Sequence, residues 1–298
     1  MSSPRSVEIF DTRICALGEG PAVSGHQNNL VTWVDIYQKK VLSKDLESGV
    51  IGEFSLPSLD KEITFAIPRS RGGQILGVTG GPFLCDPDGT LTSLGLWEQA
   101  FLLGKSPTLR WNDAKVAPTG SLWAGTMASD STLQAGSLFC IFDDGKQMKE
   151  VIKDVSISNG LDWSPDGKKF YFVDTMKFRL DSFDFENDLV SNHKILCEFD
   201  KDKDGYPDGL TIDAEGCIWL AFWNGGVVKR ISPQGEVLEN LVMPVSGPTS
   251  CTFVGSNLNL LIITTAKNED SEPEGAKSGM TFCVETTVPG KLNYLLNY

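Results

Sequence analysis

A strand–turn–strand theme recurs along the chain at a nearly constant interval, and it constrains the fold more than any other feature. A turn built on Pro-x-Gly, or a close variant, precedes an apolar strand in CDPDGTL (85–91), VAPTGSLWAGT (116–126), WSPDGKKFYFVDT (163–175) and IDAEGCIWLAFW (212–223). Proline presets φ in such a turn, and glycine adopts the left-handed conformation that closes the hairpin. The theme therefore predicts many short antiparallel strands.

The middle of each post-turn strand provides a marker for measuring the interval. Trp123, Tyr171 and Trp219 are 48 residues apart, and intervals of 43 to 47 residues extend the series to Trp33, Leu76 and Ile262. Six all-strand units of about 40–50 residues are typical of a β-propeller. We predict an all-β fold, a six-bladed β-propeller with four-stranded antiparallel blades, with residues 1–298 as a single domain. A two-domain β-sandwich is the alternative, but it would not produce such even spacing.

The end of the chain has a place in this ring. The segment 266–282 is polar and loop-like, and MTFCVE (280–285) is strand-like. We expect this last strand to complete a blade with the N-terminal strand. Because both ends are then needed for closure, we expect a monomer.

The charge balance excludes several classes of function. The chain has 26 Lys+Arg against 39 Asp+Glu, a formal net charge of -13, and only two histidines. An acidic chain without a run of basic residues is not expected to bind nucleic acid. His26 and His193 cannot form a three-histidine zinc site, and no motif supports either as a catalytic base.

The apolar residues and cysteines indicate the compartment. No apolar stretch reaches the roughly 18–20 residues that span a bilayer, and the N-terminus lacks the apolar stretch of a signal peptide. The seven cysteines are scattered without a CxxC pair, which predicts buried free thiols. We therefore expect a cytoplasmic protein that makes no membrane contact.

Three polar residues lie beside glycines at positions where inner strands of a propeller would converge. Glu19 lies between two glycines in LGEGP, where the backbone can approach closely. Asn159 in SNGLDW and Asp208 in PDGL occupy the same place in successive repeats, 49 residues apart. Taken singly, Glu19 could be a surface carboxylate, and Asn-Gly and Asp-Gly could be ordinary turns. The shared register instead favours an Asn and an Asp that point toward a common axis.

A fourth position combines a guanidinium with an amide. Arg110 and Asn112 lie two residues apart in LRWNDAKVAP, so an extended strand places both on one face. Their donors and acceptor suit the hydroxyl and carbonyl groups of a sugar. Asp113 should point the other way, into the scaffold.

As a set, these motifs resemble the regucalcin/gluconolactonase family, which also takes in senescence marker proteins, sugar-acid lactonases and luciferin-regenerating enzymes. The resemblance runs from about residue 8 to 285, through LGEGP, LVTWVDI, RWNDAKVAPTGSLWAGTM, SNGLDWSPDGKKFYFVDT, PDGLTIDAEGCIWLAFWNGGVVKRISPQGEV and ITTAK. It implies a six-bladed propeller with one divalent cation near its axis. The implied metal ligands are Glu19, Asn159 and Asp208, the implied substrate-binding residues are Arg110 and Asn112, and Asp208 matches the usual general base.

The resemblance also implies one further substrate contact, and the sequence shows some departures from the family pattern. An acidic substrate contact follows the GTM motif in some members, and Asp130 could fill this role. Val23 stands where an aromatic residue often follows LGEGP, and Ala114 and Ala117 replace common Gly and Asp residues. These departures alter the channel lining, so they bear on substrate identity more than on reaction type.

The expected reaction is metal-dependent hydrolysis that opens a sugar-acid lactone, an aldonolactone, to the free sugar acid. The cation polarises the carbonyl, and Asp208 or a metal-bound water supplies the base or nucleophile. The metal-bound water is a serious alternative because a cation lowers the pKa of a carboxylate that binds it, which makes Asp208 a weaker base. Oxygen ligands favour calcium first, then magnesium or manganese, while zinc and iron(II) stay open.

Two other functions stay open. One is a non-enzymatic calcium-binding regulatory or interaction propeller, which would not need the pair Arg110 and Asn112. The other is hydrolysis of another ester or a phosphoester.

The segment DKDKDG (200–205) imitates the start of an EF-hand loop. The twelfth position is Thr211 rather than Glu, and strands are expected on both sides. We interpret the segment as a solvated acidic loop near Asp208, with a weak accessory calcium site as the alternative.

Overall fold

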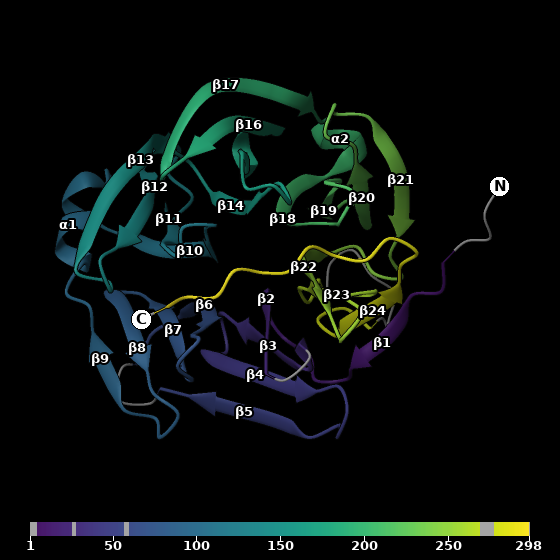
Figure 1. Ribbon diagram of the computed structural model, residues 1–298, viewed down its shortest axis with the longest axis horizontal. Helices are drawn as coiled ribbons and strands as arrows, with labels where there is room; N and C mark the ends of the chain where they lie inside the picture. Colours follow the sequence, from purple (N-terminus) through teal and green to yellow (C-terminus); the bar gives the residue numbers. More distant parts are fainter. Residues whose placement is uncertain (1–4, 26–27, 57–59, 269–276, 298) are drawn as a thin grey trace.

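The structure is a computed structural model that describes residues 5–25, 28–56, 60–268 and 277–297. Six four-stranded antiparallel sheets surround a central axis like the blades of a propeller (Figure 1). The predicted fold class is confirmed. His26, which was assigned no function, lies outside the described residues.

The first three blades follow one another along the chain, each from its innermost strand outward. Blade 1 consists of β2 (Gly18–Ser24), β3 (Leu30–Asp35), β4 (Lys40–Asp45) and β5 (Ile51–Ser55). Blade 2 consists of β6 (Ile63–Pro68), β7 (Gln74–Val78), β8 (Gly81–Cys85) and β9 (Leu91–Ser93). Blade 3 consists of β10 (Leu109–Val116), β11 (Leu122–Ala128), β12 (Gly136–Phe142) and β13 (Gln147–Val155).

The next two blades repeat this order, and the sixth joins the two ends of the chain. Blade 4 consists of β14 (Ser158–Trp163), β15 (Lys169–Asp174), β16 (Arg179–Glu186) and β17 (Leu189–Glu198). Blade 5 consists of β18 (Tyr206–Ile212), β19 (Ile218–Trp223), β20 (Val227–Ile231) and β21 (Val237–Val242). Blade 6 consists of β22 (Pro248–Val254), β23 (Leu260–Thr265), β24 (Thr281–Glu285) and β1 (Glu8–Asp11).

Blade 6 closes the ring as the sequence predicted. The outer strand β1 pairs antiparallel with β24, with Glu8 opposite Cys283 and Ile9 opposite Phe282. The segment MTFCVE thus completes a blade with the N-terminal strand.

The repeat markers lie on equivalent strands and form the core. Each is on the second strand of its blade and at most 3% exposed: Trp33, Leu76, Trp123, Tyr171, Trp219 and Ile262. Aromatic side chains pack between neighbouring blades, as where Trp123 of blade 3 meets Trp163 of blade 4 edge to face at 5.5 Å. The even spacing therefore reflects one buried layer repeated in each blade.

The predicted turn chemistry is also confirmed. The glycine has a positive φ in each of the four quoted turns, at Gly89, Gly120, Gly167 and Gly216. Its N–H donates to the carbonyl three residues earlier, at 2.8 to 2.9 Å in all four. These glycines close hairpins in a conformation that other residues rarely adopt.

Few helices occur among the described residues. They are α1 (Trp97–Leu103), the 3-10 turn η2 (Thr175–Lys177) and α2 (Lys201–Asp204). None of the helices described is long and apolar enough to cross a membrane. All seven cysteines are free; five are buried, while Cys197 and Cys283 are partly exposed.

A C-terminal strap, which we define as residues 286–297, runs from blade 6 across one face of the ring (Figure 1, yellow). Ala214 N–H donates to the carbonyl of Pro289 at 2.8 Å, and Ser70 N–H donates to that of Leu296 at 2.8 Å. Leu296 is fully buried in the core between blades 2 and 3. The strap thus links blades on opposite sides of the ring.

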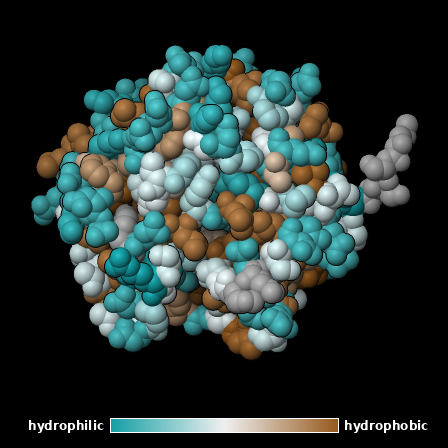
Figure 2. Space-filling view, viewed as in Figure 1, coloured by the Kyte–Doolittle hydropathy of each residue, from teal (hydrophilic) through white to brown (hydrophobic). Residues whose placement is uncertain are grey.

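A buried charge cluster holds the middle of the strap. Lys291 Nζ lies 2.9 Å from one oxygen of Asp162, and Lys115 Nζ lies 2.8 Å from the other. Burial alone would raise the pKa of Asp162, but the two ammonium groups hold it below its usual value. Figure 2 shows this face, with apolar atoms gathered near its hollowed centre.

The acidic segment 200–205 is not an EF-hand. Between β17 and β18 it forms the single turn α2, and the Asp200 side chain accepts a hydrogen bond from the N–H of Asp202. Lys203 Nζ lies 3.0 Å from Asp200, and Lys229 Nζ lies 2.9 Å from Asp204. It is a solvated acidic loop partly neutralised by lysines.

Candidate metal centre

A cavity of about 430 Å³ opens at the axis, and inner strands from four blades supply its polar residues. Five residues singled out in the sequence line it together: Glu19, Arg110, Asn112, Asn159 and Asp208. None of the described strap residues lines this cavity. The structure therefore brings the proposed metal ligands and the proposed substrate pair to one place, while their roles stay predictions.

Irregularities in the inner strands lie at these residues. The pairing register shifts between Glu19 and Ala22 in β2, between Ser158 and Leu161 in β14, and between Pro207 and Leu210 in β18. A bulge re-aims side chains and ends regular pairing locally. A register shift therefore occurs at the candidate site residue in the innermost strand of several blades.

The glycines of NGL and DGL serve close packing rather than turns. A Cβ on Gly160 would lie 2.6 Å from the carbonyl oxygen of Asp208, and one on Gly209 would lie 2.1 Å from the hydroxyl of Ser250. Both glycines lie inside strands. Glycine at these positions lets neighbouring inner strands approach the axis side by side.

A buried hydrogen-bond chain connects the proposed substrate pair to Asn159. Arg110 Nη1 donates to Asn112 Oδ1 at 2.7 Å, and Asn112 Nδ2 donates to Asn159 Oδ1 at 2.8 Å. Asn159 Nδ2 in turn donates to Thr175 Oγ1 at 2.8 Å, and that hydroxyl donates to the carbonyl of Pro207. These hydrogen bonds run from blade 3 to blade 5 and fix the orientations of the Asn112 and Asn159 amides.

The carboxylates have strongly perturbed pKa values. Burial, followed by the nearby charge of Asp113, raises the pKa of Glu19 to about 8. Burial, followed by the charges of Glu19 and Asp113, raises the pKa of Asp208 well above its usual value. Oδ1 of Asp208 is buried without a hydrogen-bond partner. Clustered acids of this kind need a proton or a cation to stay buried.

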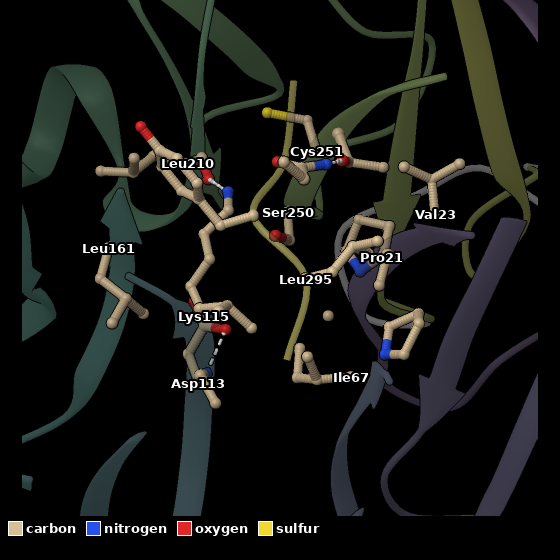
Figure 3. A pocket seen from close by; sticks show the side chains of 18 residues that line it. Pro21, Val23, Ile67, Asp113, Lys115, Leu161, Leu210, Ser250, Cys251 and Leu295 are labelled. Carbon is tan, nitrogen blue, oxygen red and sulfur yellow. Dashed lines mark hydrogen bonds between the residues drawn. The ribbon is translucent and has the colours of Figure 1, made fainter. Parts of the chain in front are cut away.

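Asp113 corrects one expectation. It was predicted to point into the scaffold, and it does not line the 430 Å³ cavity. Instead it lines a second, enclosed cavity of about 50 Å³ on the axis, together with Lys115 and Leu295 (Figure 3). Burial raises the pKa of Asp113 to about 6 although Lys115 opposes the shift. The pairing register of β10 shifts between Trp111 and Ala114, so regular alternation of side chains between the two faces breaks down at Asp113.

The remaining sequence candidates lie around the site. Asp130 is in an exposed turn after β11 and accepts hydrogen bonds from Thr132, while its neighbour Ser131 lines the cavity. Val23 and Ala114, two of the departures from the family pattern, line the enclosed cavity. Ala117 is buried in the core between blades 3 and 4.

The donor set fits a hard cation. Among the described residues no group of three or more His, Cys, Asp and Glu side chains could hold a metal. The candidate centre instead combines two carboxylates, Glu19 and Asp208, with the amide oxygen of Asn159. The unpartnered Asp208 Oδ1 supplies an available acceptor. Oxygen donors of this type suit calcium, magnesium or manganese.

Sequence reasoning missed the walls of the cavity. Thr175 and Met176 line it from η2, which directly follows β15 of blade 4, and Tyr206 and Trp223 line it from strand ends in blade 5. The only available signal was the position of these residues at strand ends, and strand ends in most propeller blades look alike.

The fold and the site define a six-bladed propeller with a carboxylate-rich axial centre, and the sequence comparison identifies the family. A family model described as "SMP-30/Gluconolactonase/LRE-like region" matches residues 17–267, so the chain belongs to this family. Human regucalcin is 33% identical over 274 residues, which cover 88% of this chain and 86% of the relative. The 6-deoxy-6-sulfogluconolactonase of Pseudomonas putida is 33% identical over 283 residues, which cover 92% of each chain.

Solved structures agree in fold. A calcium-binding regucalcin from Agrobacterium tumefaciens superposes with a TM-score of 0.90 at 27% identity and covers 100% of both chains. A luciferin-regenerating enzyme superposes with a TM-score of 0.88 at 29% identity and covers 99% of this chain and 100% of the other. At the level of the family, the sulfogluconolactonase relative and the family model support a lactonase-type hydrolase.

Proposed function

We propose that this protein is a divalent-cation-dependent lactonase that opens a sugar-acid lactone to the free acid. One observation carries the proposal: Asp208 has a buried oxygen without a partner, in a cluster with Glu19. A cation would satisfy that oxygen and relieve the repulsion between the two carboxylates. The sulfogluconolactonase relative supports the reaction class.

Glu19, Asn159 and Asp208 would hold the cation, with calcium the leading candidate because all three donors are oxygens. When bound there, a divalent cation acts as a Lewis acid on the lactone carbonyl. The calcium-binding relative of known structure supports this choice of metal.

The other residues position the reactants. Arg110 donates to Asn112 and has further donors for a substrate carbonyl or hydroxyl. Asp208 accepts the proton of the attacking water, whose oxygen bonds to the acyl carbon. The ring C–O bond breaks, and the departing alkoxide takes that proton back from Asp208. Asp130 would contact the substrate only at the outer edge of the cavity.

A second candidate is a non-enzymatic calcium-binding propeller. The observation in its favour is that Asn112 and Asn159 bond mainly to protein groups. Such a network could serve only to stabilise a cation site. The free cysteine thiols are consistent with the reducing cytosol in either case.

The two candidates separate in a pH-stat assay with glucono-, galactono-, xylono- and arabinonolactones, with and without EDTA. We expect acid release above the spontaneous rate, loss of that release in EDTA, and recovery with calcium. Absence of chelator-sensitive acid release from every lactone would reject the lactonase in favour of the calcium-binding propeller. Elemental analysis of gently purified protein identifies the native metal.

A further inference from the structure

The 430 Å³ cavity has a polar floor and apolar walls. The carboxylates and amides lie on the inner strands, whereas the surrounding wall residues are mostly apolar or aromatic, among them Ile36, Met127, Ile157, Met176, Tyr206 and Trp223. Ser131 and Lys267 add polar groups to the wall, but both residues are exposed. A molecule that enters the cavity therefore contacts largely apolar surface.

Two wall residues belong to a row of aromatic rings. Tyr206 at the start of β18 is paired across the sheet with Trp223 at the end of β19, and their ring centroids are 5.5 Å apart. Phe178 packs behind Tyr206 at 5.4 Å. The three rings form a continuous surface, because cross-strand and neighbouring aromatic pairs support one another.

The backbone at Phe178 adopts an unfavourable conformation to complete this row. Its φ is 49° and its ψ is 46°, the left-handed region that bulky residues rarely occupy. Its N–H donates to the carbonyl of Thr175 at 3.1 Å, which ends η2. Strain of this kind persists only where the surroundings hold it, and it concentrates near functional sites.

The floor offers few free donors to a polyhydroxylated substrate. Asn112 Nδ2 donates to Ser158 O and to Asn159 Oδ1, and Asn159 Nδ2 donates to Thr175 Oγ1. The Thr175 hydroxyl proton is directed to Pro207. Sugar hydroxyls that leave water for an apolar wall lose hydrogen bonds that the wall does not replace.

We infer that the preferred substrate is a lactone whose ring meets the polar floor and whose substituent is apolar, a deoxy, alkyl or aryl group that packs on Tyr206 and Trp223. This inference rests on the proposed lactonase function and narrows its substrate class. The wall is thus a specificity element, separate from the groups that perform hydrolysis.

The test compares a 6-deoxyhexonolactone with the parent hexonolactone of the same configuration, and an alkyl-substituted δ-lactone with the unsubstituted ring. We expect kcat/KM to favour the less polar member by about 10-fold or more, the scale on which one apolar group is discriminated in a pocket. Trp223→Ser should reduce that preference at least several-fold. Tyr206→Phe should keep it because the ring remains, whereas Tyr206→Ser should lose it.

The ratio of the two kcat/KM values is measured within each variant, so partial unfolding of a variant cancels. Phe101→Leu changes an exposed aromatic residue of α1 outside the cavity and should leave the ratio unchanged. Equal or better turnover of the parent sugar lactone, or a ratio insensitive to Trp223→Ser, would overturn the inference while leaving the lactonase intact. Lack of chelator-sensitive hydrolysis of every lactone would reject both.

Discussion

Asn112 Nδ2 on blade 3 donates a hydrogen bond to Asn159 Oδ1 on blade 4 at 2.8 Å, which joins a proposed substrate residue to a proposed metal ligand. The same nitrogen donates to the carbonyl of Ser158 at 2.7 Å. Asn112 therefore fixes the orientation of the Asn159 amide, whose oxygen is a proposed metal donor. The proposed substrate pair and the proposed metal site are thus coupled by hydrogen bonds.

Replacing Asn112 with Ala should impair turnover through this link. We expect kcat/KM to fall by about 100-fold, the scale of a misplacement of roughly 1 Å in a reacting geometry. Steady-state kinetics with saturating calcium measures the loss. Asn192→Ala, which removes an exposed contact to Asp184, is the matched control and should retain full activity. Wild-type kinetics in the Asn112 variant would contradict the positioning role.

Replacing Glu19 with Gln changes the volume of the side chain very little. It should nevertheless remove most of the stabilisation that calcium gives to the folded protein. A ligand that binds only the folded state raises the free energy of unfolding, so added calcium should increase the Tm of the wild type. The increase should largely vanish in the variant. Asp202→Asn in the acidic loop serves as the control; if it abolished the calcium response instead, the metal would be bound at the loop.

The metal-free protein should lose stability as the pH rises from about 4.5 to about 8. The pKa of Glu19 is raised from 4.5 to about 8 in the folded state, so the folded protein binds more protons than the unfolded chain in that interval. The free energy of unfolding therefore falls with rising pH. Urea unfolding in EDTA at pH 5 and pH 8 measures the difference, and Glu19→Gln should reduce it. A flat profile in the wild type would show that Glu19 titrates normally.

Lys291→Met should destabilise the whole propeller. It leaves the buried Asp162 with Lys115 as its remaining ion-pair partner, so the cost should be below the roughly 3–5 kcal/mol of a buried charge left without any partner. The measurement is the free energy of unfolding in urea. Lys168→Met, at an exposed hairpin position, should change it little. Similar stabilities for the two variants would mean that the Lys291–Asp162 ion pair contributes nothing measurable to holding the strap.

Native thiols should react slowly with a thiol-specific reagent at pH 8. Burial raises the pKa of Cys15 and Cys140 to about 12, so almost no thiolate is present at that pH. Counting reactive thiols before and after denaturation measures the protection, and all seven should appear after unfolding. If every cysteine reacted rapidly in the folded protein, the burial of these thiols in the core would be contradicted.

Much of the fold could be predicted because its signals are local and repeated. Trp123 and Trp219 mark equivalent second strands, and Gly167 and Gly216 close equivalent hairpins. Each blade therefore contributed independent evidence for the same architecture. The axial position of Asn159 and Asp208 followed from their shared register in two such repeats.

The parts that the sequence could not predict depend on contacts between distant segments. Asp113 lines the axial 50 Å³ cavity at a register shift in β10, which alternation alone does not reveal. The ion pairs of Asp162 join Lys115 of blade 3 and Lys291 of the strap, far apart in sequence. The aromatic row behind the cavity needs a left-handed Phe178, a conformation without a sequence signature.

Ring closure also determines when the protein can become functional during its synthesis. Glu19 is made long before β24, yet β1 has its partner β24 only after residue 285, and the strap follows that strand. Contacts of such long sequence separation form late in folding. A chain still attached to the ribosome would present open strand edges and an unclosed axis. The proposed cation centre and the apolar cavity should therefore mature only after β24 has left the ribosome.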